Sequence, residues 1–111
     1  MKEPEAISPD TVETYLGQPD IFIFDCNSTS SFKKHHVPGA KHLDPAGYKQ
    51  SDLPPDKSAT LIFYCSDTSC GAGPYAAKRA ISFGFQNVLV MKEGIKGWIK
   101  KHKMHDEPDW K

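Results

Sequence analysis

Three apolar runs stand out along the chain, and none of them alternates with polar residues. They cover residues 21–24, 59–64 and 88–91. Continuous apolar runs of this length are typical of strands that are buried on both faces of a parallel sheet. A shorter strand is expected at residues 41–43, after the turn formed by Pro38 and Gly39. The pattern therefore predicts a small sheet covered by helices on each side.

Helices are expected in the polar segments between these strands. Ser8 supplies a capping hydroxyl, Pro9 fits the first helical turn, and Gly17 ends the segment. Ala77, Ala80 and Ile81 recur at helical spacing after Pro74. The alternation of strands and helices predicts an α/β sandwich. The expected helices lie at residues 8–17, 29–34, 46–49, 74–84 and 94–101.

Composition limits the classes of protein to which the chain can belong. Its 111 residues suit one domain, 1–111, with a polar tail at 103–111. Lys plus Arg and Asp plus Glu number 14 each, so the charge gives no case for nucleic acid or an anionic membrane as partner. The first residues lack the apolar run of a signal peptide, and no apolar stretch is long enough to cross a bilayer, so a cytoplasmic location is expected.

The three cysteines point to thiol chemistry. Their number is odd, and none shows a Cys-x-x-Cys spacing, so neither a disulfide framework nor a metal site is expected, and no cofactor is implied. Cys65 ends the run 59–64 and precedes a Gly-rich loop and a helix that Pro74 opens. Free N–H groups at a helix start stabilise an anion in front of them, so Cys65 is predicted to be a nucleophile with a lowered pKa. A buried cysteine that ends a core strand is the alternative.

A second residue is expected close to Cys65. Asp25 also ends an apolar run, and the carboxyl ends of parallel strands meet at one edge of a sheet, where ligands bind. Asp25 either receives hydrogen bonds from the loop after Cys65 or caps the turn that follows its own strand.

Five motifs, in order, resemble the rhodanese family of sulfurtransferases, and the likeness extends from Ile7 to Trp98. A strand ending in Asp25 stands where the family has Asp-Val-Arg, and Cys65 stands at the position of the family's active cysteine. The remaining three resemble the family's His-Ile-Pro-Gly-Ala, Gly-Phe/Tyr-x-Asn-Val and Gly-Gly-Ile-x-x-Trp segments. In this chain they read His36-Val37-Pro38-Gly39-Ala40, Gly84-Phe85-Gln86-Asn87-Val88 and Glu93-Gly94-Ile95-Lys96-Gly97-Trp98.

This resemblance implies a rhodanese-like three-layer sandwich and a sulfurtransferase activity. Cys65 would accept a sulfane sulfur from thiosulfate, another small sulfur-containing anion or a persulfide donor, and would pass it to cyanide or a thiol acceptor. Asp25 would support the site. The donor would be held by the loop Ser66, Asp67, Thr68, Ser69, Cys70, Gly71, Ala72 and Gly73, through inward N–H groups.

The chain also departs from the family. Asn27 replaces the Arg of Asp-Val-Arg, so a salt bridge that braces the site is missing or rebuilt. No Lys or Arg lies between residues 66 and 73, and Cys70 occupies a position that often holds Arg. Anion binding must then rest on backbone dipoles or on side chains from other segments. Cys70 itself is open to three interpretations: a resolving thiol, a second sulfur carrier, or a residue without a role.

Other functions fit the same residues. Cys65 and Cys70 could form a dithiol redox module, and rhodanese folds also serve as non-catalytic interaction domains. A cysteine phosphatase or arsenate reductase would need an Arg where Cys70 stands. Cys26 and Trp98 are expected in the core, and His36 in a structural turn.

Overall fold

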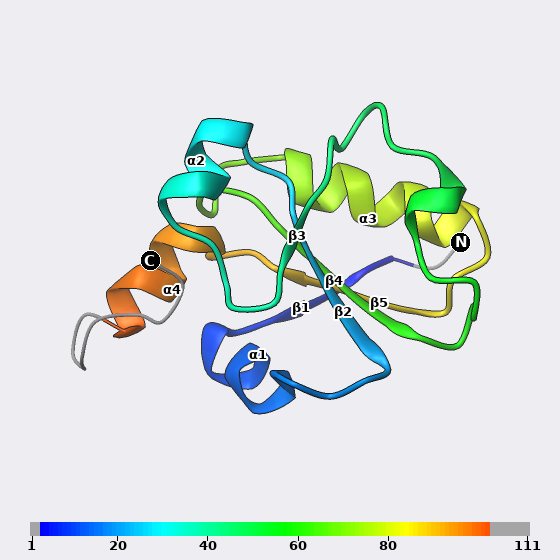
Figure 1. Ribbon diagram of the computed structural model, residues 1–111, viewed down its shortest axis with the longest axis horizontal. Helices are drawn as coiled ribbons and strands as arrows, with labels where there is room; N and C mark the ends of the chain where they lie inside the picture. The colour runs from blue at the N-terminus through cyan, green and yellow to red at the C-terminus, as the bar shows by residue number, and fades with distance from the viewer. Residues whose placement is uncertain (1–2, 103–111) are drawn as a thin grey trace.

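The computed structural model describes residues 3–102, which form one central sheet and the helices packed on it. The expected polar tail at 103–111 lies outside the described residues. The strand order is β1-β5-β4-β2-β3, and every pairing is parallel (Figure 1). The strands are β1 (Glu5–Ile7), β2 (Ile21–Asp25), β3 (Lys41–His42), β4 (Thr60–Tyr64) and β5 (Asn87–Met91). The helices are α1 (Pro9–Tyr15), α2 (Thr29–Lys34), α3 (Ala72–Ser82) and α4 (Gly94–His102), with a 3-10 turn η1 (Gln50–Asp52).

Helices cover both faces of this sheet, which confirms the predicted α/β sandwich. Successive side chains of β4 point to opposite faces: Phe63 packs toward α3, and Ile62 packs toward α1 and α4. Ala76, Ala77 and Ala80 of α3 are fully buried, which lets that helix lie close to the strands. Trp98 of α4 is 2% exposed and fills the opposite layer, as expected of a core residue.

The helix ends follow the signals in the sequence. The Ser8 hydroxyl accepts a hydrogen bond from the N–H of Thr11 at 3.2 Å, with Pro9 in the first turn of α1. The Ser28 hydroxyl caps α2 in the same way, accepting from the N–H of Ser31 at 3.2 Å. Gly84 follows α3 with a φ of +103°, a backbone conformation that favours glycine.

Two predictions about the elements were wrong or incomplete. The strand β1 was not expected, because its sequence Glu-Ala-Ile has too little apolar character to be recognised. The helix predicted at 46–49 is instead a single turn from Asp44 to Tyr48, followed by η1. Tyr48 is drawn into the core, and its hydroxyl donates to the carbonyl of Ala76 at 2.7 Å, so the segment cannot continue as a helix.

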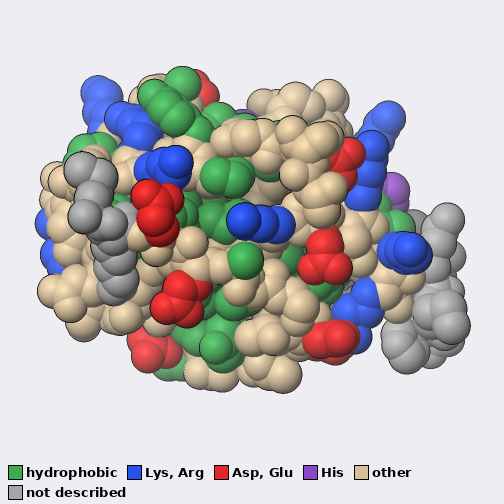
Figure 2. All heavy atoms as spheres, turned by 180° about the vertical axis from the view of Figure 1, so that it is seen from behind, with side chains coloured by type: hydrophobic (Ala, Val, Ile, Leu, Met, Phe, Trp, Pro, Cys, Tyr) green, Lys and Arg blue, Asp and Glu red, His purple; other side chains and the backbone are tan. Residues whose placement is uncertain are grey.

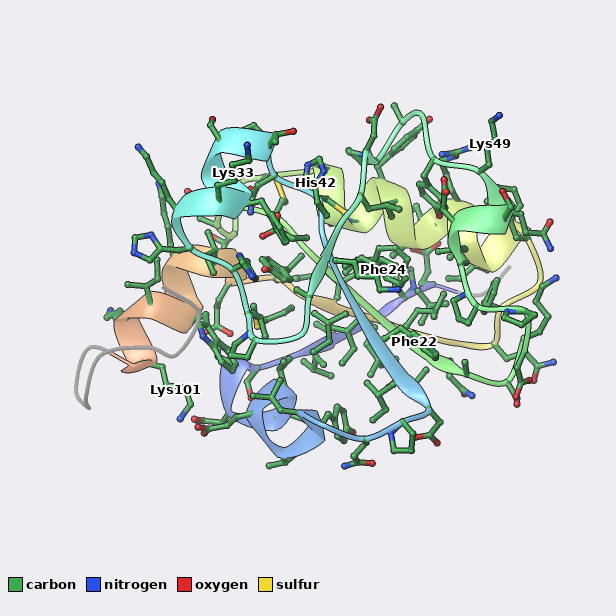
Figure 3. The ribbon with its side chains drawn as sticks, in the orientation of Figure 1. Phe22, Phe24, Lys33, His42, Lys49 and Lys101 are labelled. Atoms are coloured by element: carbon green, nitrogen blue, oxygen red, sulfur yellow. A yellow bond between two sulfur atoms is a disulfide. The ribbon has the colours of Figure 1, made fainter. Side chains whose placement is uncertain are left out.

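The surface mixes charges of both signs. Figure 2 shows acidic and basic side chains interspersed on the rear face, with small hydrophobic areas between them. Lys101 of α4 reaches α1, where its Nζ lies 2.6 Å from Asp10 Oδ1 and 3.1 Å from Glu13 Oε1 (Figure 3). Within residues 3–102, no helix has the length and apolar character needed to span a membrane.

Candidate active site

The predicted site lies at the carboxyl edge of the sheet, between α3 and α4 (Figure 1). Cys65 follows the last residue of β4 and is 4% exposed. Its Sγ accepts a hydrogen bond from the N–H of Gly73 at 3.3 Å, in the first turn of α3. The structure thus places the sulfur at a helix N-terminus, as the sequence indicated.

Helix α3 begins at Ala72, two residues before the predicted start at Pro74. Ala72 and Gly73, which were expected in the loop, therefore belong to the helix, and Gly71 is its N-cap. A Cβ on Gly73 would meet the backbone carbon atoms of Tyr64 at 3.2 Å. The small residue lets the start of α3 approach Cys65 closely.

Cys65 and Cys70 form a disulfide in this structure. Their Cα atoms are 6.3 Å apart, within the range that a disulfide spans. A turn between them, closed by the hydrogen bond from Cys70 N–H to the Asp67 carbonyl at 3.1 Å, brings Cys70 back toward Cys65. The geometry therefore permits the pairing that a resolving thiol requires.

The rest of the loop is organised by Asp67 and by α4. Asp67 Oδ1 accepts from the Ser69 hydroxyl at 2.7 Å and from its N–H at 3.0 Å, and Oδ2 pairs with Lys96 Nζ at 3.3 Å. The Ser69 hydroxyl is the main cause of a lowered pKa at Asp67, followed by the Ser69 N–H and Lys96. The only charged side chain between residues 66 and 73 is therefore an anion already held by its neighbours.

The first turn of α4 anchors the loop through the backbone. The N–H of Ile95 donates to the Cys65 carbonyl at 2.9 Å, and that of Lys96 donates to the Ser66 carbonyl at 3.0 Å. Gly94 has a φ of +65°, and a Cβ there would lie 2.6 Å from the Cys65 carbonyl oxygen. The Gly-Ile step of α4 is thus a structural part of the site, which the sequence analysis did not assign.

Asp25 ends β2 and is paired in register with Tyr64, the residue before Cys65. Its carboxylate is fully buried, with Oδ1 accepting from the Asn27 N–H at 2.8 Å and Oδ2 from the Tyr64 hydroxyl at 2.7 Å. Tyr64 in turn accepts from the N–H of Val37 at 2.9 Å. Of the two roles expected for Asp25, the structure shows the turn cap, and the link to the loop runs through Tyr64. Two neutral donors, the Asn27 N–H and the Tyr64 hydroxyl, thus hold the carboxylate.

The side chain of Asn27 does not pair with Asp25. Its Nδ2 is buried with no hydrogen-bond partner among the described residues. Its backbone carbonyl oxygen accepts a hydrogen bond from His42 Nε2 at 2.8 Å.

Cys26 is the third cysteine, and it lies on the strand next to Cys65. Asp25 and Tyr64 are paired in register, so Cys26 and Cys65 follow them side by side, both in the layer covered by α3. Burial, reinforced by the charge of Asp25, raises the pKa of the Cys26 thiol to about 12. Cys26 is a core residue, as predicted, and stays protonated at neutral pH.

A cavity of about 150 Å³ opens over the two bonded cysteines. Cys65, Thr68, Cys70 and Pro74 line it, together with Val90, Met91 and Lys92 at the end of β5. The role of Lys92 in this wall was not predicted, although Lys92 directly follows an apolar run, as Asp25 does. Two larger cavities, of about 260 and 350 Å³, lie away from Cys65 and have no cysteine in their walls.

His36 occupies a local turn. Its Nδ1 lies 2.6 Å from the Phe32 carbonyl, and its ring stacks on Phe32 with 4.0 Å between centroids. Among residues 3–102, no group of His, Cys, Asp and Glu side chains is arranged to hold a metal ion.

The sequence matches the family profile of the Rhodanese-like domain over residues 8–101. The chain belongs to the rhodanese-like domain family. The matched segment includes β2, β4, the loop between Cys65 and Cys70, and most of α4. It therefore contains all the residues of the site described above. No curated protein sequence matches the chain significantly.

Solved structures share this rhodanese-like fold. A protein from Bacillus halodurans superposes with a TM-score of 0.80 at 21% identity, covering 88% of this chain and 73% of that one. A single-domain sulfurtransferase from Saccharomyces cerevisiae gives 0.73 at 17%, covering 97% and 98%. A human single-domain sulfurtransferase gives 0.69 at 16%, covering 91% and 98%. At these identities the likeness shows a common fold.

Proposed function

We propose that this protein is a rhodanese-type sulfurtransferase in which Cys65 carries the transferred sulfur as a persulfide. The observation that supports this most is the position of Cys65 Sγ at the end of a central strand. There it accepts a hydrogen bond from the N–H of Gly73 in the first turn of α3. That N–H and the free end of the helix stabilise a thiolate and, after reaction, a persulfide anion. The single-domain sulfurtransferases among the structural neighbours agree with the proposal.

The reaction begins with reduction of the Cys65–Cys70 disulfide by a thiol reductant, which gives two thiols. The Cys65 thiolate then attacks the outer sulfur of a small sulfur-containing anion or a persulfide donor. The S–S bond of the donor breaks, and its other half leaves with the electron pair. Cyanide or a thiolate next attacks the outer sulfur of the persulfide, which restores the Cys65 thiolate.

A reducing compartment suits this chemistry. Thiol reductants in the cytoplasm would keep Cys65 and Cys70 open and ready to accept sulfur. We therefore assign the protein to the cytoplasm as part of the proposal. Oxidation would close the disulfide and protect Cys65 from irreversible oxidation to sulfinic acid.

The disulfide itself favours a second candidate, a dithiol redox module. In that function Cys65 and Cys70 would exchange a disulfide with another protein, and no sulfur atom would be transferred. Cys70 would then be essential, whereas a sulfurtransferase requires Cys65 alone. The two candidates are separated by the Cys70→Ser variant.

Intact-mass spectrometry tests the proposal. Protein that has been reduced and freed of reductant should gain the mass of one sulfur atom on incubation with thiosulfate or a thiosulfonate, and cyanide should remove it. Peptide mapping should place the added sulfur on residue 65. Cys70→Ser serves as the matched control and should still load.

Sulfur that loads equally on Cys65→Ser would refute the proposal. Failure of wild type to load from any of these donors, together with disulfide exchange that is lost in Cys70→Ser, would establish the redox module instead.

A further inference from the structure

Lys92 is the charged residue in the wall of the cavity over Cys65 and Cys70. It follows β5 directly, just as Cys65 follows β4, so the parallel register of these neighbouring strands brings both to the same edge. Its side chain is exposed, and none of the salt bridges within residues 3–102 includes it. An exposed lysine side chain without a salt bridge among the described residues therefore belongs to the wall of this cavity.

Lys92 is the cation that a ligand in this cavity can reach, because the nearby charged side chains already have partners. The loop from 66 to 73 contains no Lys or Arg, and its single acid, Asp67, is held by Ser69 and Lys96. Lys96 is thereby paired with Asp67, and it is not among the residues that line the cavity. The N–H groups of Ile95 and Lys96 are also occupied, because they donate to the loop carbonyls.

The remaining walls are neutral and partly apolar. Pro74 and Val90 present apolar surface, and Thr68 brings a hydroxyl. One cation, one hydroxyl and an apolar wall fit a singly charged donor that carries an organic group. A doubly charged inorganic donor would leave one of its charges without a partner.

We infer that Lys92 is a substrate-positioning residue that holds the anionic end of an organic sulfur donor of the thiosulfonate class. This rests on the proposed function of Cys65. The ammonium group binds the sulfonyl oxygens while the outer sulfur faces Cys65. The thiolate attacks that sulfur, the S–S bond breaks, and the sulfinate leaves with the electron pair, so one thiolate and one thiosulfonate give one persulfide anion and one sulfinate.

Alkylation measures the charge at the site without any sulfur transfer. Reduced Cys70→Ser protein, in which Cys65 is the accessible thiol, is treated with iodoacetate, which is negative, and with iodoacetamide, which is neutral. Adding Lys92→Met should lower the ratio of the two rates about fivefold, mainly through iodoacetate, because the anionic reagent loses its partner. Lys92→Arg should retain the ratio. Lys49→Met removes an equal charge from an exposed position before η1, at the end of the molecule away from α4 (Figure 3), and should leave the ratio unchanged.

Steady-state kinetics with benzenethiosulfonate and thiosulfate test the choice of donor. Wild type should show the higher kcat/KM with benzenethiosulfonate. Lys92→Met should raise the KM for it about fivefold with kcat unchanged, while the melting temperature stays that of wild type.

Each outcome decides a separate point. An unchanged alkylation ratio in Lys92→Met overturns the inference, whether or not the protein transfers sulfur. Preference for thiosulfate overturns the assignment of the donor. A changed ratio without persulfide formation from any donor supports the anion site at Lys92 and refutes the sulfurtransferase proposal.

Discussion

At the scale of single residues, Tyr64 connects the buried parts of the site. Its hydroxyl donates to Asp25 and accepts from the N–H of Val37, so one oxygen joins β2, the turn after α2 and the strand that delivers Cys65. Burial raises the pKa of Tyr64 far above its usual value, and the charge of Asp25 adds to this. The hydroxyl therefore remains a hydrogen-bond donor at every physiological pH.

Tyr64→Phe should lower the free energy of unfolding by about 1–3 kcal/mol, because the Asp25 carboxylate and the Val37 N–H lose a partner in the core. Chemical denaturation measures this effect. Tyr75→Phe, which removes a hydroxyl from a side chain that is 54% exposed, is the matched control and should change the stability by less than about 0.5 kcal/mol. Equal effects of the two variants would show that the buried hydroxyl contributes nothing to stability.

The identity of Cys65 as the candidate nucleophile could be deduced from the sequence, because an apolar run, a Gly-rich loop and a helix start leave a distinct local pattern. The roles of Tyr64 and Lys92 could not. Tyr64 belongs to an apolar run, and only the fold shows that its hydroxyl donates a hydrogen bond to Asp25 on the neighbouring strand β2. Lys92 resembles any lysine that follows a strand until the cavity is seen.

At the scale of elements, the site depends on how α3 and α4 meet the end of β4. Helix α3 directs its first turn at Cys65, and α4 holds the loop carbonyls with its own first N–H groups. Continuous apolar runs predicted the three longest strands well, since burial on both faces dominates those segments. The prediction of a helix at residues 46–49 was wrong because the local pattern cannot show that the Tyr48 hydroxyl donates to the carbonyl of Ala76, which lies in α3 far along the chain.

Gly94→Ala tests the junction between α4 and the loop. Its φ is +65°, and the added Cβ would lie 2.6 Å from the backbone of Cys65 and Ser66. We expect a loss of about 2–3 kcal/mol in the free energy of unfolding, together with slower alkylation of reduced Cys65. Gly39→Ala is the matched control, since Gly39 has a φ of +83° and nothing within 4 Å of the added Cβ.

The Gly39 variant should show only the backbone cost of about 1–2 kcal/mol and normal alkylation of Cys65. If both variants alkylate Cys65 at the wild-type rate, the close approach of α4 does not shape the site.

At the scale of the whole molecule, the parallel sheet gathers residues that are far apart in sequence. Asp25 ends β2, Cys65 follows β4 and Lys92 follows β5, and the parallel register brings all three to one edge. The same packing buries Cys26 and Tyr48, whose pKa values are both raised to about 12, in each case mainly by burial. The family profile and the five motifs made this architecture predictable, whereas the state of the Cys65–Cys70 pair required the folded loop.

Alkaline pH should reveal the buried thiol. Because the pKa of Cys26 is higher in the folded protein than its ordinary value of 9.0, its contribution to stability is complete below about pH 9 and declines as pH rises toward 12. Ionisation of Cys26 contributes at most about 1.4 kcal/mol per pH unit to the slope of the unfolding free energy against pH. Denaturant titrations of wild type and Cys26→Ala between pH 8 and 11 measure it. The wild-type stability should fall more steeply, and parallel curves would contradict the pKa assignment.

The most direct test of the account counts the sulfur atoms that one chain delivers. Protein is reduced, loaded with a thiosulfonate, freed of excess donor and treated with cyanide, and the thiocyanate formed is measured. Wild type and Cys70→Ser should each release about one thiocyanate per chain, whereas Cys65→Ser and unreduced wild type should release none. Release from Cys65→Ser at the wild-type level would contradict the claim that Cys65 carries the sulfur.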